Sequence, residues 1–274
     1  MVKLEERIAY WSDFGVTNYK NLFEFQERLA QFRLQNKIPD VIIFSEHYPV
    51  ISFGATNTHN KFNPDFLKKI KEEYGNDKEE TVIKYLKDHK IDFFKASRGG
   101  GATYIGQGQL LTYPIVDFVK IVKKDFGVSE YKSLIDKIMY EVLKYDFNLN
   151  VNIFEVAKEL KEENSDMRKD RKDVWLILDG KNYKIGAKGI HTTKNIAYHG
   201  FSIYVKKDSL KGFDLILACG YDKNELDVNC IESQLSKKIK MNDVKEKILK
   251  KLKEKFGYKN LIYKNPEELE RLVD

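Results

Sequence analysis

The stretch Arg98–Asp117, RGGGATYIGQGQLLTYPIVD, places a cation, five glycines and an apolar run next to one another. Glycine at this density weakens a chain unless the backbone must approach something closely or adopt a positive φ. The stretch therefore predicts either a loop that lays bare backbone against a ligand or a long glycine-rich hairpin turn. The run that follows, residues 110–116, is typical of a buried strand.

Neither of the common phosphate-binding loops fits this stretch. Gln107 stands where a P-loop needs lysine, and a predicted strand rather than a helix comes next. Counted from Gly99, the sixth position of a dinucleotide fingerprint is Tyr104 instead of glycine. The loop is therefore not expected to hold nucleotide phosphates.

Outward from this stretch, helices alternate with strands. The predicted helices span residues 13–35, 63–73, 131–145 and 244–256. The predicted strands span residues 41–45, 50–53, 91–96, 110–116, 174–178, 183–187, 196–205 and 215–218. Asp179-Gly180 marks a hairpin between two of them. This order predicts an α+β fold in which a mixed β-sheet is flanked by helices.

The composition is that of a globular protein of 274 residues, with 42% hydrophobic and 33% charged residues. No run approaches the roughly 18 apolar residues of a membrane span, and the N-terminus does not resemble a secretory signal. Two cysteines make no disulfide framework, so we expect a reducing, cytoplasmic setting. The net charge of +6 suits an acidic partner but is too diffuse to indicate nucleic acid. The five histidines lack metal-ligand spacing, and no metal site is expected.

Cys219 is the residue with the most reactive context. It follows an apolar run and precedes Gly220, which suits a nucleophile exposed in a tight turn, although a free cysteine is more often buried and inert. A reactive thiolate needs a nearby cation, and Lys184 on the neighbouring predicted strand can supply it. Cys230 has no comparable context and is interpreted as structural. His199 alone is interpreted as a hydrogen-bonded structural residue.

Several segments together resemble the octanoyltransferases, which are lipoyl(octanoyl) transferases. RGGGATYIGQGQLLTYPIVDF resembles that family's RGG-x-x-TYHGPGQL block. In family order, VIIFSEHYPVISFG, YKIGAKGI, AYHGFSIYV and FDLILACGYDKNEL are similar to further family motifs. The resemblance spans roughly residues 13–235.

The resemblance implies a fold like the biotin/lipoyl protein ligase catalytic domain. It implies that Cys219 carries the acyl group as a thioester and that Lys184 favours the thiolate and handles the proton. The implied substrate-binding residues are Arg98, Gly99, Gly100, Gly101, Ala102, Thr103, Tyr104, Ile105, Ala187, Lys188, Gly189, His199, Gly200, Phe201 and Ser202. No cofactor and no metal are implied.

The implied reaction moves an octanoyl group from octanoyl-acyl carrier protein to a lysine. The implied acceptors are lipoyl domains of 2-oxoacid dehydrogenases and the glycine cleavage H protein. We expect a monomer that binds neither nucleic acid nor membrane. Residues 1–274 are expected to form a single catalytic domain, with insertions near residues 74–90 and 155–172 and a basic helical C-terminal extension at 236–274.

The sequence departs from the family pattern at the glycine stretch and near the predicted site. Ile105 replaces the family's histidine, and Gln107 and Ala218 replace prolines. Lys188 replaces a small or aliphatic residue and predicts a second cation near the site. Two other activities stay open. An ATP-dependent lipoate-protein ligase of the same fold needs no cysteine, and a thioesterase-like hydrolase or silent acyl-binding protein would tolerate the loss of the histidine.

Overall fold

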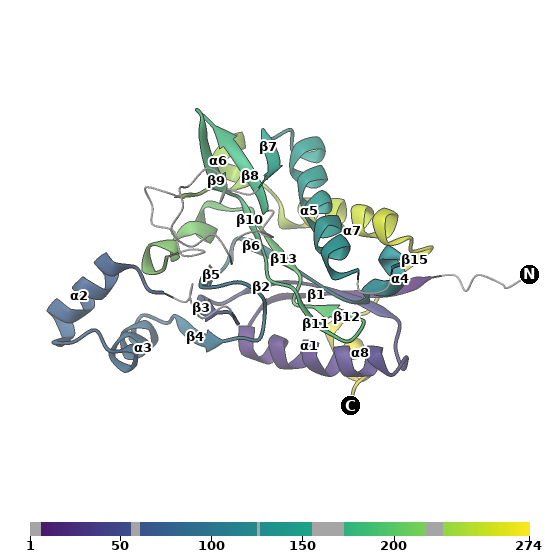
Figure 1. The fold of residues 1–274 in the computed structure, drawn as a ribbon, viewed down its shortest axis with the longest axis horizontal. Helices are drawn as coiled ribbons and strands as arrows, with labels where there is room; N and C mark the ends of the chain where they lie inside the picture. The colour runs from purple at the N-terminus through teal and green to yellow at the C-terminus, as the bar shows by residue number, and fades with distance from the viewer. Residues whose placement is uncertain (1–6, 56–60, 125–126, 155–172, 218–226) are drawn as a thin grey trace, which may run out of the picture.

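The computed structural model describes residues 7–55, 61–124, 127–154, 173–217 and 227–274. Cys219 and the whole predicted insertion at 155–172 therefore lie outside the described residues. The described chain forms one large mixed sheet and two smaller sheets, with helices on both faces of the large one (Figure 1).

The large sheet has eight strands, and the glycine stretch leads directly into its centre. Its main path runs β10 (Gly186–Lys188), β13 (Phe201–Tyr204), β6 (Gln109–Asp117), β2 (Asp40–His47), β1 (Ile8–Thr17) and β15 (Asn260–Tyr263). Two further strands lie off this path: β12 (Ile196–Tyr198) pairs with β6, and β11 (His191–Thr193) pairs with β12. β1 is parallel to both β2 and β15, whereas the other pairs are antiparallel.

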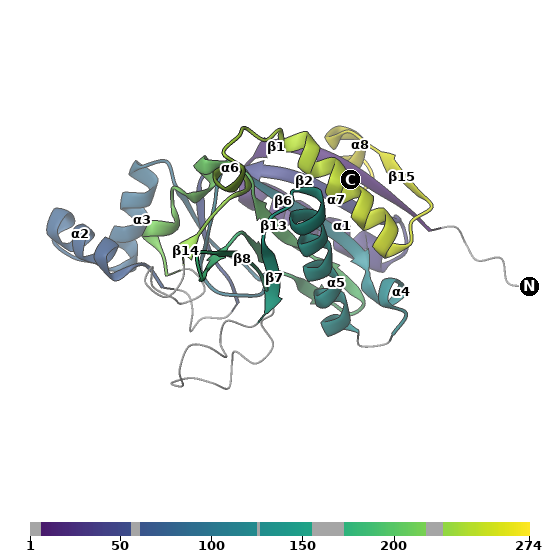
Figure 2. The ribbon, with the colours of Figure 1, turned by 90° about the horizontal axis from the view of Figure 1, so that it is seen from above.

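Helices cover both faces of this sheet. On one face lie α5 (Val128–Glu141) and α7 (Met241–Phe256), and on the other lie α1 (Tyr19–Leu34) and α8 (Pro266–Glu270) (Figures 1 and 2). Two separate apolar cores result, because side chains alternate between the faces of a strand. On β6, Leu110 and Val116 enter the α5–α7 core, while Leu111, Tyr113 and Ile115 enter the α1 core.

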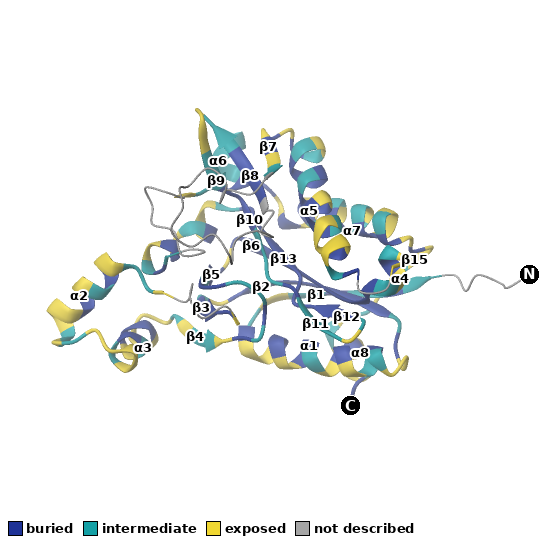
Figure 3. Ribbon diagram, viewed as in Figure 1, coloured by how far each residue is buried: buried dark blue, intermediate teal, exposed yellow. Residues whose placement is uncertain are grey.

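A second sheet with two helices projects from the body (Figure 1). Its strands, in spatial order, are β4 (Asp92–Lys95), β3 (Val50–Phe53) and β5 (Thr103–Ile105). The helices α2 (Pro64–Tyr74) and α3 (Glu79–Asp88) share a third apolar core with it and are largely exposed outside (Figure 3). This sheet holds the glycine stretch, because β5 lies within that stretch and pairs with β3.

A four-stranded sheet brings the predicted lysine to the large sheet. Its order is β14 (Asp227–Val228), β9 (Lys181–Lys184), β8 (Asp173–Leu178) and β7 (Val151–Phe154). Lys184 ends β9, and the chain passes through Ile185 into β10 of the large sheet. The short helices α4 (Phe118–Val122) and α6 (Ile231–Leu235) are the remaining α-helices of the described residues. No described helix has both the length and the apolar content of a membrane span.

The expected α+β fold with a mixed, helix-flanked sheet is confirmed, and three predicted elements need correction. The first helix begins at Tyr19 instead of residue 13, because residues up to Thr17 pair with β2. The strand predicted over 196–205 is two strands, since His199 and Gly200 both adopt positive φ between them. The strand predicted to start at Leu215 does not start there, because Leu215 is the last residue of a 3-10 turn.

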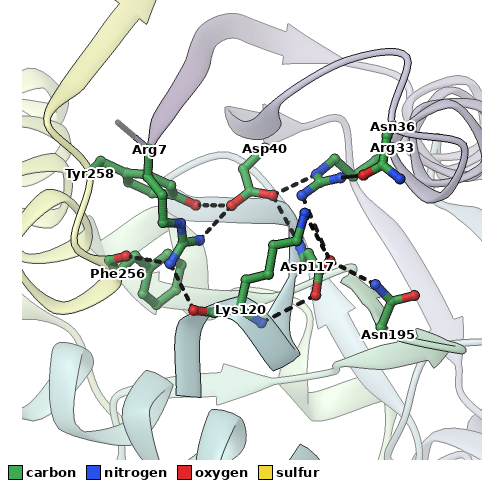
Figure 4. Close-up of polar contacts among 9 residues, drawn as sticks. All are labelled: Arg7, Arg33, Asn36, Asp40, Asp117, Lys120, Asn195, Phe256 and Tyr258. Atoms are coloured by element: carbon green, nitrogen blue, oxygen red, sulfur yellow. Dashed lines mark hydrogen bonds and ion pairs between the residues drawn. The ribbon is translucent and has the colours of Figure 1, made fainter. Parts of the chain in front are cut away.

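A buried ion cluster ties the C-terminal residues to the sheet (Figure 4). Asp40 Oδ1 accepts hydrogen bonds from Arg33 Nε at 2.7 Å and from the Asp117 N–H at 3.1 Å. Asp40 Oδ2 accepts from Arg7 at 2.9 Å and from the Tyr258 hydroxyl at 2.7 Å. Because Tyr258 follows α7 and precedes β15, the cluster fixes the C-terminal part of the chain to the start of β2.

Candidate active site

A single pocket gathers the glycine stretch, β10 and β13. It contains about 650 Å³ of space including its mouth, a size suited to a small-molecule ligand. The predicted site residues that line it are Arg98, Gly100, Gly101, Ala102, Thr103, Ile105, Lys184, Ala187, Lys188, Gly189, His199, Gly200, Phe201 and Ser202. We call this pocket the slot.

Two predicted residues do not line the slot, and Cys219 lies outside the described residues. Gly99 lies against Ile190, whose carbonyl oxygen would be 2.9 Å from a Cβ placed on the glycine. The Tyr104 ring packs against Gly212 and forms an edge contact with Phe213, with ring centroids 5.8 Å apart. Both therefore support the wall of the slot from outside it.

Strand register explains why residues distant in sequence share one wall. Ala187 lies opposite Ser202 on β13, and Ser202 lies opposite Leu111 on β6. Residues directly opposite in a sheet point to the same face. The three side chains therefore form a row across three strands, and this row makes one wall of the slot.

The glycines let two backbone segments approach more closely than side chains would allow. A Cβ on Gly54 would lie 2.3 Å from the Gly100 carbonyl oxygen, and Gly100 itself has φ +88°. The Gly54 N–H donates to the Gly101 carbonyl at 3.3 Å. The glycine loop therefore packs directly on the end of β3. This is the close approach of backbone that the density of glycines predicted.

Arg98 anchors this loop through its guanidinium group. Its Nε donates to Ser52 Oγ at 3.1 Å, and Nη2 donates to the Ser52 carbonyl at 2.5 Å. A third bond runs from Nη1 to the Gly99 carbonyl at 3.1 Å. The side chain is buried, so these contacts hold the glycine loop against β3 from inside the protein.

Lys184 lies at one end of the slot. Its side chain is 3% exposed, and Nζ lies 5.8 Å from the centre of the Trp175 ring. The Lys184 carbonyl accepts from the Asn229 N–H at 2.9 Å, and β14 pairs with β9 at this position. The described residues on both sides of segment 218–226 are thus held, since Leu217 N–H also donates to the Lys61 carbonyl at 3.0 Å.

Lys188 lines the slot, but its ammonium group is not a second free cation there. It forms a salt bridge with Asp136 of α5, and both side chains are almost fully buried. Asp136 belongs to the helix that covers the α5–α7 face of the sheet. The lysine therefore fastens α5 to β10 on the face opposite the row formed by Ala187 and Ser202.

His199 lies at the other end of the slot. Its ring stacks on Phe23 with centroids 4.3 Å apart and an angle of 19° between the planes. Nε2 is buried and makes no hydrogen bond with any residue in the described ranges. Burial, together with the charges of His191 and Arg98, lowers the pKa of His199 to about 3. The imidazole is therefore neutral at physiological pH.

Behind this end, His47 and Tyr113 form a buried pair that the sequence did not indicate. His47 Nδ1 lies 3.0 Å from the Thr17 carbonyl, and Nε2 lies 2.7 Å from the Tyr113 hydroxyl. A carbonyl only accepts, so Nδ1 carries the proton and the Tyr113 hydroxyl donates to Nε2. Burial lowers the pKa of His47 to about 4 and raises the pKa of Tyr113 well above its ordinary value.

Five lining residues were missed by sequence reasoning: Tyr19, Leu111, Tyr113, Tyr204 and Phe213. Leu111 and Tyr113 carried a usable signal, because they alternate along the predicted strand after the glycine loop. Tyr19 and Phe213 carried none, since only tertiary packing brings the start of α1 and the 3-10 turn Phe213–Leu215 to the slot.

The family model of the lipoyl protein ligase A/B catalytic domain matches residues 18–253 of this chain. The chain belongs to that family. An octanoyltransferase of Dictyoglomus turgidum is 32% identical over 240 residues, which cover 88% of this chain and 84% of the relative. One from Caldicellulosiruptor bescii is 29% identical and covers 85% of each chain. The expectation of an acyltransferase in this family is confirmed.

Solved structures share the fold. Lipoate-protein ligase A bound with ATP superposes with a TM-score of 0.63 at 14% identity, covering 98% of this chain and 92% of that one. A bipartite lipoate protein ligase of Thermoplasma acidophilum, studied with its E2 lipoyl domain, gives a TM-score of 0.60 at 13% identity and covers 98% and 90%. At these identities the likeness is one of fold.

Proposed function

We propose that this protein transfers an octanoyl group from the thioester of acyl carrier protein to a lysine of a lipoyl domain. The acceptors are lipoyl domains of 2-oxoacid dehydrogenases and the glycine cleavage H protein. The observation that carries the proposal is a slot lined both by Lys184 and by the motif residues of the glycine stretch. Relatives named octanoyltransferase support the choice of acyl group.

In the first step, the Cys219 thiolate attacks the carbonyl carbon of the carrier thioester. A bond forms between the cysteine sulfur and that carbon, and the bond to the carrier sulfur breaks. The carrier thiolate takes a proton from the Lys184 ammonium and leaves as a thiol, so Lys184 becomes an amine. Thioester exchange costs little in bond energy and divides the transfer into two easier steps. Lys184 favours the thiolate electrostatically, and its position beside β14 supports this role.

In the second step, the amine of the target lysine attacks the acyl-enzyme. An amide bond forms, the bond between the acyl carbon and the Cys219 sulfur breaks, and the attacking nitrogen loses a proton. Lys184 in its amine form accepts that proton as the general base. The same lysine therefore acts in both steps.

The slot supplies binding energy for the acyl chain. Ile105 and Leu111 are both buried and line the slot, so Ile105 turns the position of the family's histidine into an apolar contact. An octanoyl chain has about seven carbons beyond its carbonyl, and at about 0.8 kcal/mol for each buried CH₂ they contribute about 5 kcal/mol. This is enough to select the length of the chain. A net charge of +6 favours approach of acidic carrier and lipoyl domains.

Intact-mass spectrometry after mixing the protein with octanoyl-carrier protein tests the proposal. We expect the wild type to gain the mass of one octanoyl group without ATP, as a thioester that hydroxylamine removes. Cys219→Ser is expected to lose this labile adduct. The control is Cys230→Ser, because Cys230 is fully buried beside Ser233 and is expected to leave the adduct intact.

Three outcomes separate the proposal from the alternatives. Transfer of the group from the labelled enzyme to an isolated lipoyl domain supports it. Absence of an adduct together with ATP-dependent use of free octanoate would identify a ligase. Rapid release of octanoate without transfer would identify a hydrolase.

A further inference from the structure

The slot ends in a polar group that an alkyl chain leaves without a partner. His199 is 4% exposed, and its Nε2 makes no hydrogen bond with any residue that the structure describes. A buried polar atom without a hydrogen bond is costly, and most such atoms in proteins have a partner. The imidazole lines the slot, so a bound ligand is in position to supply that partner.

Three polar side chains near His199 already make hydrogen bonds. Tyr113 donates its hydroxyl proton to His47 Nε2. Arg98 directs its guanidinium group to Ser52 and to the Gly99 carbonyl. The neighbouring His191 ring, 6.2 Å from that of His199, holds Nδ1 against the Ser97 carbonyl at 2.8 Å. Of these groups, His199 Nε2 is the buried atom that makes no hydrogen bond with any described residue.

The length of the slot brings the far end of an eight-carbon chain to His199. Ile185 follows Lys184, and its carbonyl accepts a hydrogen bond from the Tyr204 N–H. The Gly189 N–H donates to the carbonyl of Gly200, which follows His199. The extended chain from Ile185 to Gly189, four residue steps, spans about 13 Å. An extended eight-carbon chain has seven carbon–carbon bonds of about 1.5 Å each, and its zigzag shortens the end-to-end distance to roughly 9 Å. A chain whose carbonyl lies near Lys184 thus ends within a few atoms of the imidazole.

We propose that His199 enables the slot to accept acyl chains that end in a small hydrogen-bonding group, such as a terminal hydroxyl, in addition to plain alkyl chains. The proposal rests on the proposed function for the direction in which the chain enters. A hydroxyl both donates and accepts, so it can pair with neutral imidazole whichever ring nitrogen carries the proton. An apolar slot without such a group discriminates against a buried hydroxyl, because the hydroxyl then loses its hydrogen bonds with water.

A matched pair of substrates tests this directly. Octanoyl and 7-hydroxyheptanoyl groups have the same number of heavy atoms, since a hydroxyl replaces the terminal methyl. We expect wild-type kcat/KM values for the two carrier thioesters to differ by less than about fivefold. In His199→Asn, we expect the ratio of the hydroxylated to the plain substrate to fall about tenfold, whatever happens to octanoyl transfer itself.

The choice of asparagine keeps the variant folded. His199 has φ +72°, and asparagine tolerates this left-handed backbone better than most residues while lacking an atom at the position of Nε2. The control is His191→Asn, which removes the neighbouring imidazole and is expected to leave the ratio unchanged. An equal ratio in wild type and His199→Asn, with both proteins folded by circular dichroism, would overturn the proposal.

A second measurement is independent of catalysis. With ¹⁵N-histidine protein, we expect the His199 Nε2 resonance to shift on addition of 7-hydroxyheptanoate and to stay within linewidth on addition of octanoate. The same response to both acids contradicts the role of His199. Failure of octanoyl transfer, by contrast, would refute the proposed function and leave this binding result standing.

Discussion

The Asp40 cluster and the slot use the same large sheet in opposite ways (Figure 4). At Asp40, both carboxylate oxygens are saturated by donors from Arg7, Arg33, Tyr258 and the Asp117 backbone. In the slot, glycines expose backbone, and His199 Nε2 has no hydrogen bond among the described residues. A saturated buried cluster stabilises one conformation, whereas an unsatisfied polar group creates a binding preference. The difference separates residues that hold the fold from residues that meet a ligand.

Among the variants that test this comparison, we expect the largest effect for a substitution in the slot, and the quantity affected is the rate of octanoyl transfer. Lys184→Met removes the group that we propose as the general base, and we expect octanoyl transfer to fall by at least about 100-fold. The measurement is single-turnover transfer to a lipoyl domain. Lys181→Met is the control on the same strand, because Lys181 is exposed, and it is expected to retain transfer. Equal losses in the two variants would contradict the role given to Lys184.

A substitution in the Asp40 cluster is expected to lower the stability of the protein and to leave octanoyl transfer intact. Asp40→Asn removes the carboxylate that pairs with the buried Arg33 and the half-buried Arg7, and we expect the free energy of unfolding to fall by about 3 kcal/mol. Urea denaturation measures this, and transfer per folded molecule is expected to persist. Asp208→Asn, which breaks the exposed pair with Lys211, is expected to change the midpoint little. A large loss of turnover in folded Asp40→Asn would erase the separation between the two regions.

Two glycines with similar backbone conformations test how much close packing alone contributes to stability. Gly200 has φ +66° and Gly180 has φ +73°, so alanine is strained at both. Only at Gly200 does the new Cβ meet backbone, at 2.2 Å from the Thr112 carbonyl oxygen, whereas at Gly180 nothing lies within 4 Å. We expect Gly200→Ala to lower the free energy of unfolding by at least about 2 kcal/mol more than Gly180→Ala. Equal costs by urea denaturation would mean that the sheet relaxes around Gly200.

The smallest effect expected is a pH dependence from the pair behind the slot. Burial lowers the pKa of His47 to about 4 in the folded protein, so the unfolded chain binds more protons between about pH 4 and 6.5. The free energy of unfolding therefore falls as the pH is lowered through that window, by at most about 1.4 kcal/mol per unit for this residue. We expect His47→Gln to reduce the slope measured by denaturation at several pH values. An unchanged slope would show that His47 does not titrate there.

The fold was predictable where local patterns were strong. The strand after the glycines, the hairpin at Asp179-Gly180 and the helix ending at Phe256 were all found, because alternation, turn residues and helical periodicity are local signals. β1 was largely missed, and β15 had no strand prediction, because these neighbours are joined by pairing between residues about 250 positions apart, such as Ile8 with Asn260. The C-terminal residues thus add a strand to the large sheet as well as a basic helix.

By itself, the sequence determined the α+β class, the glycine loop and most of the residues that line the slot, since each depends on residue type and short spacing. Only the tertiary structure decided how charged and aromatic side chains are used. It sends the Lys188 ammonium to Asp136, ties Arg98 to Ser52, and stacks His199 on Phe23. These partners come from separate elements, and strand register and helix packing bring them together over distances that no local pattern records.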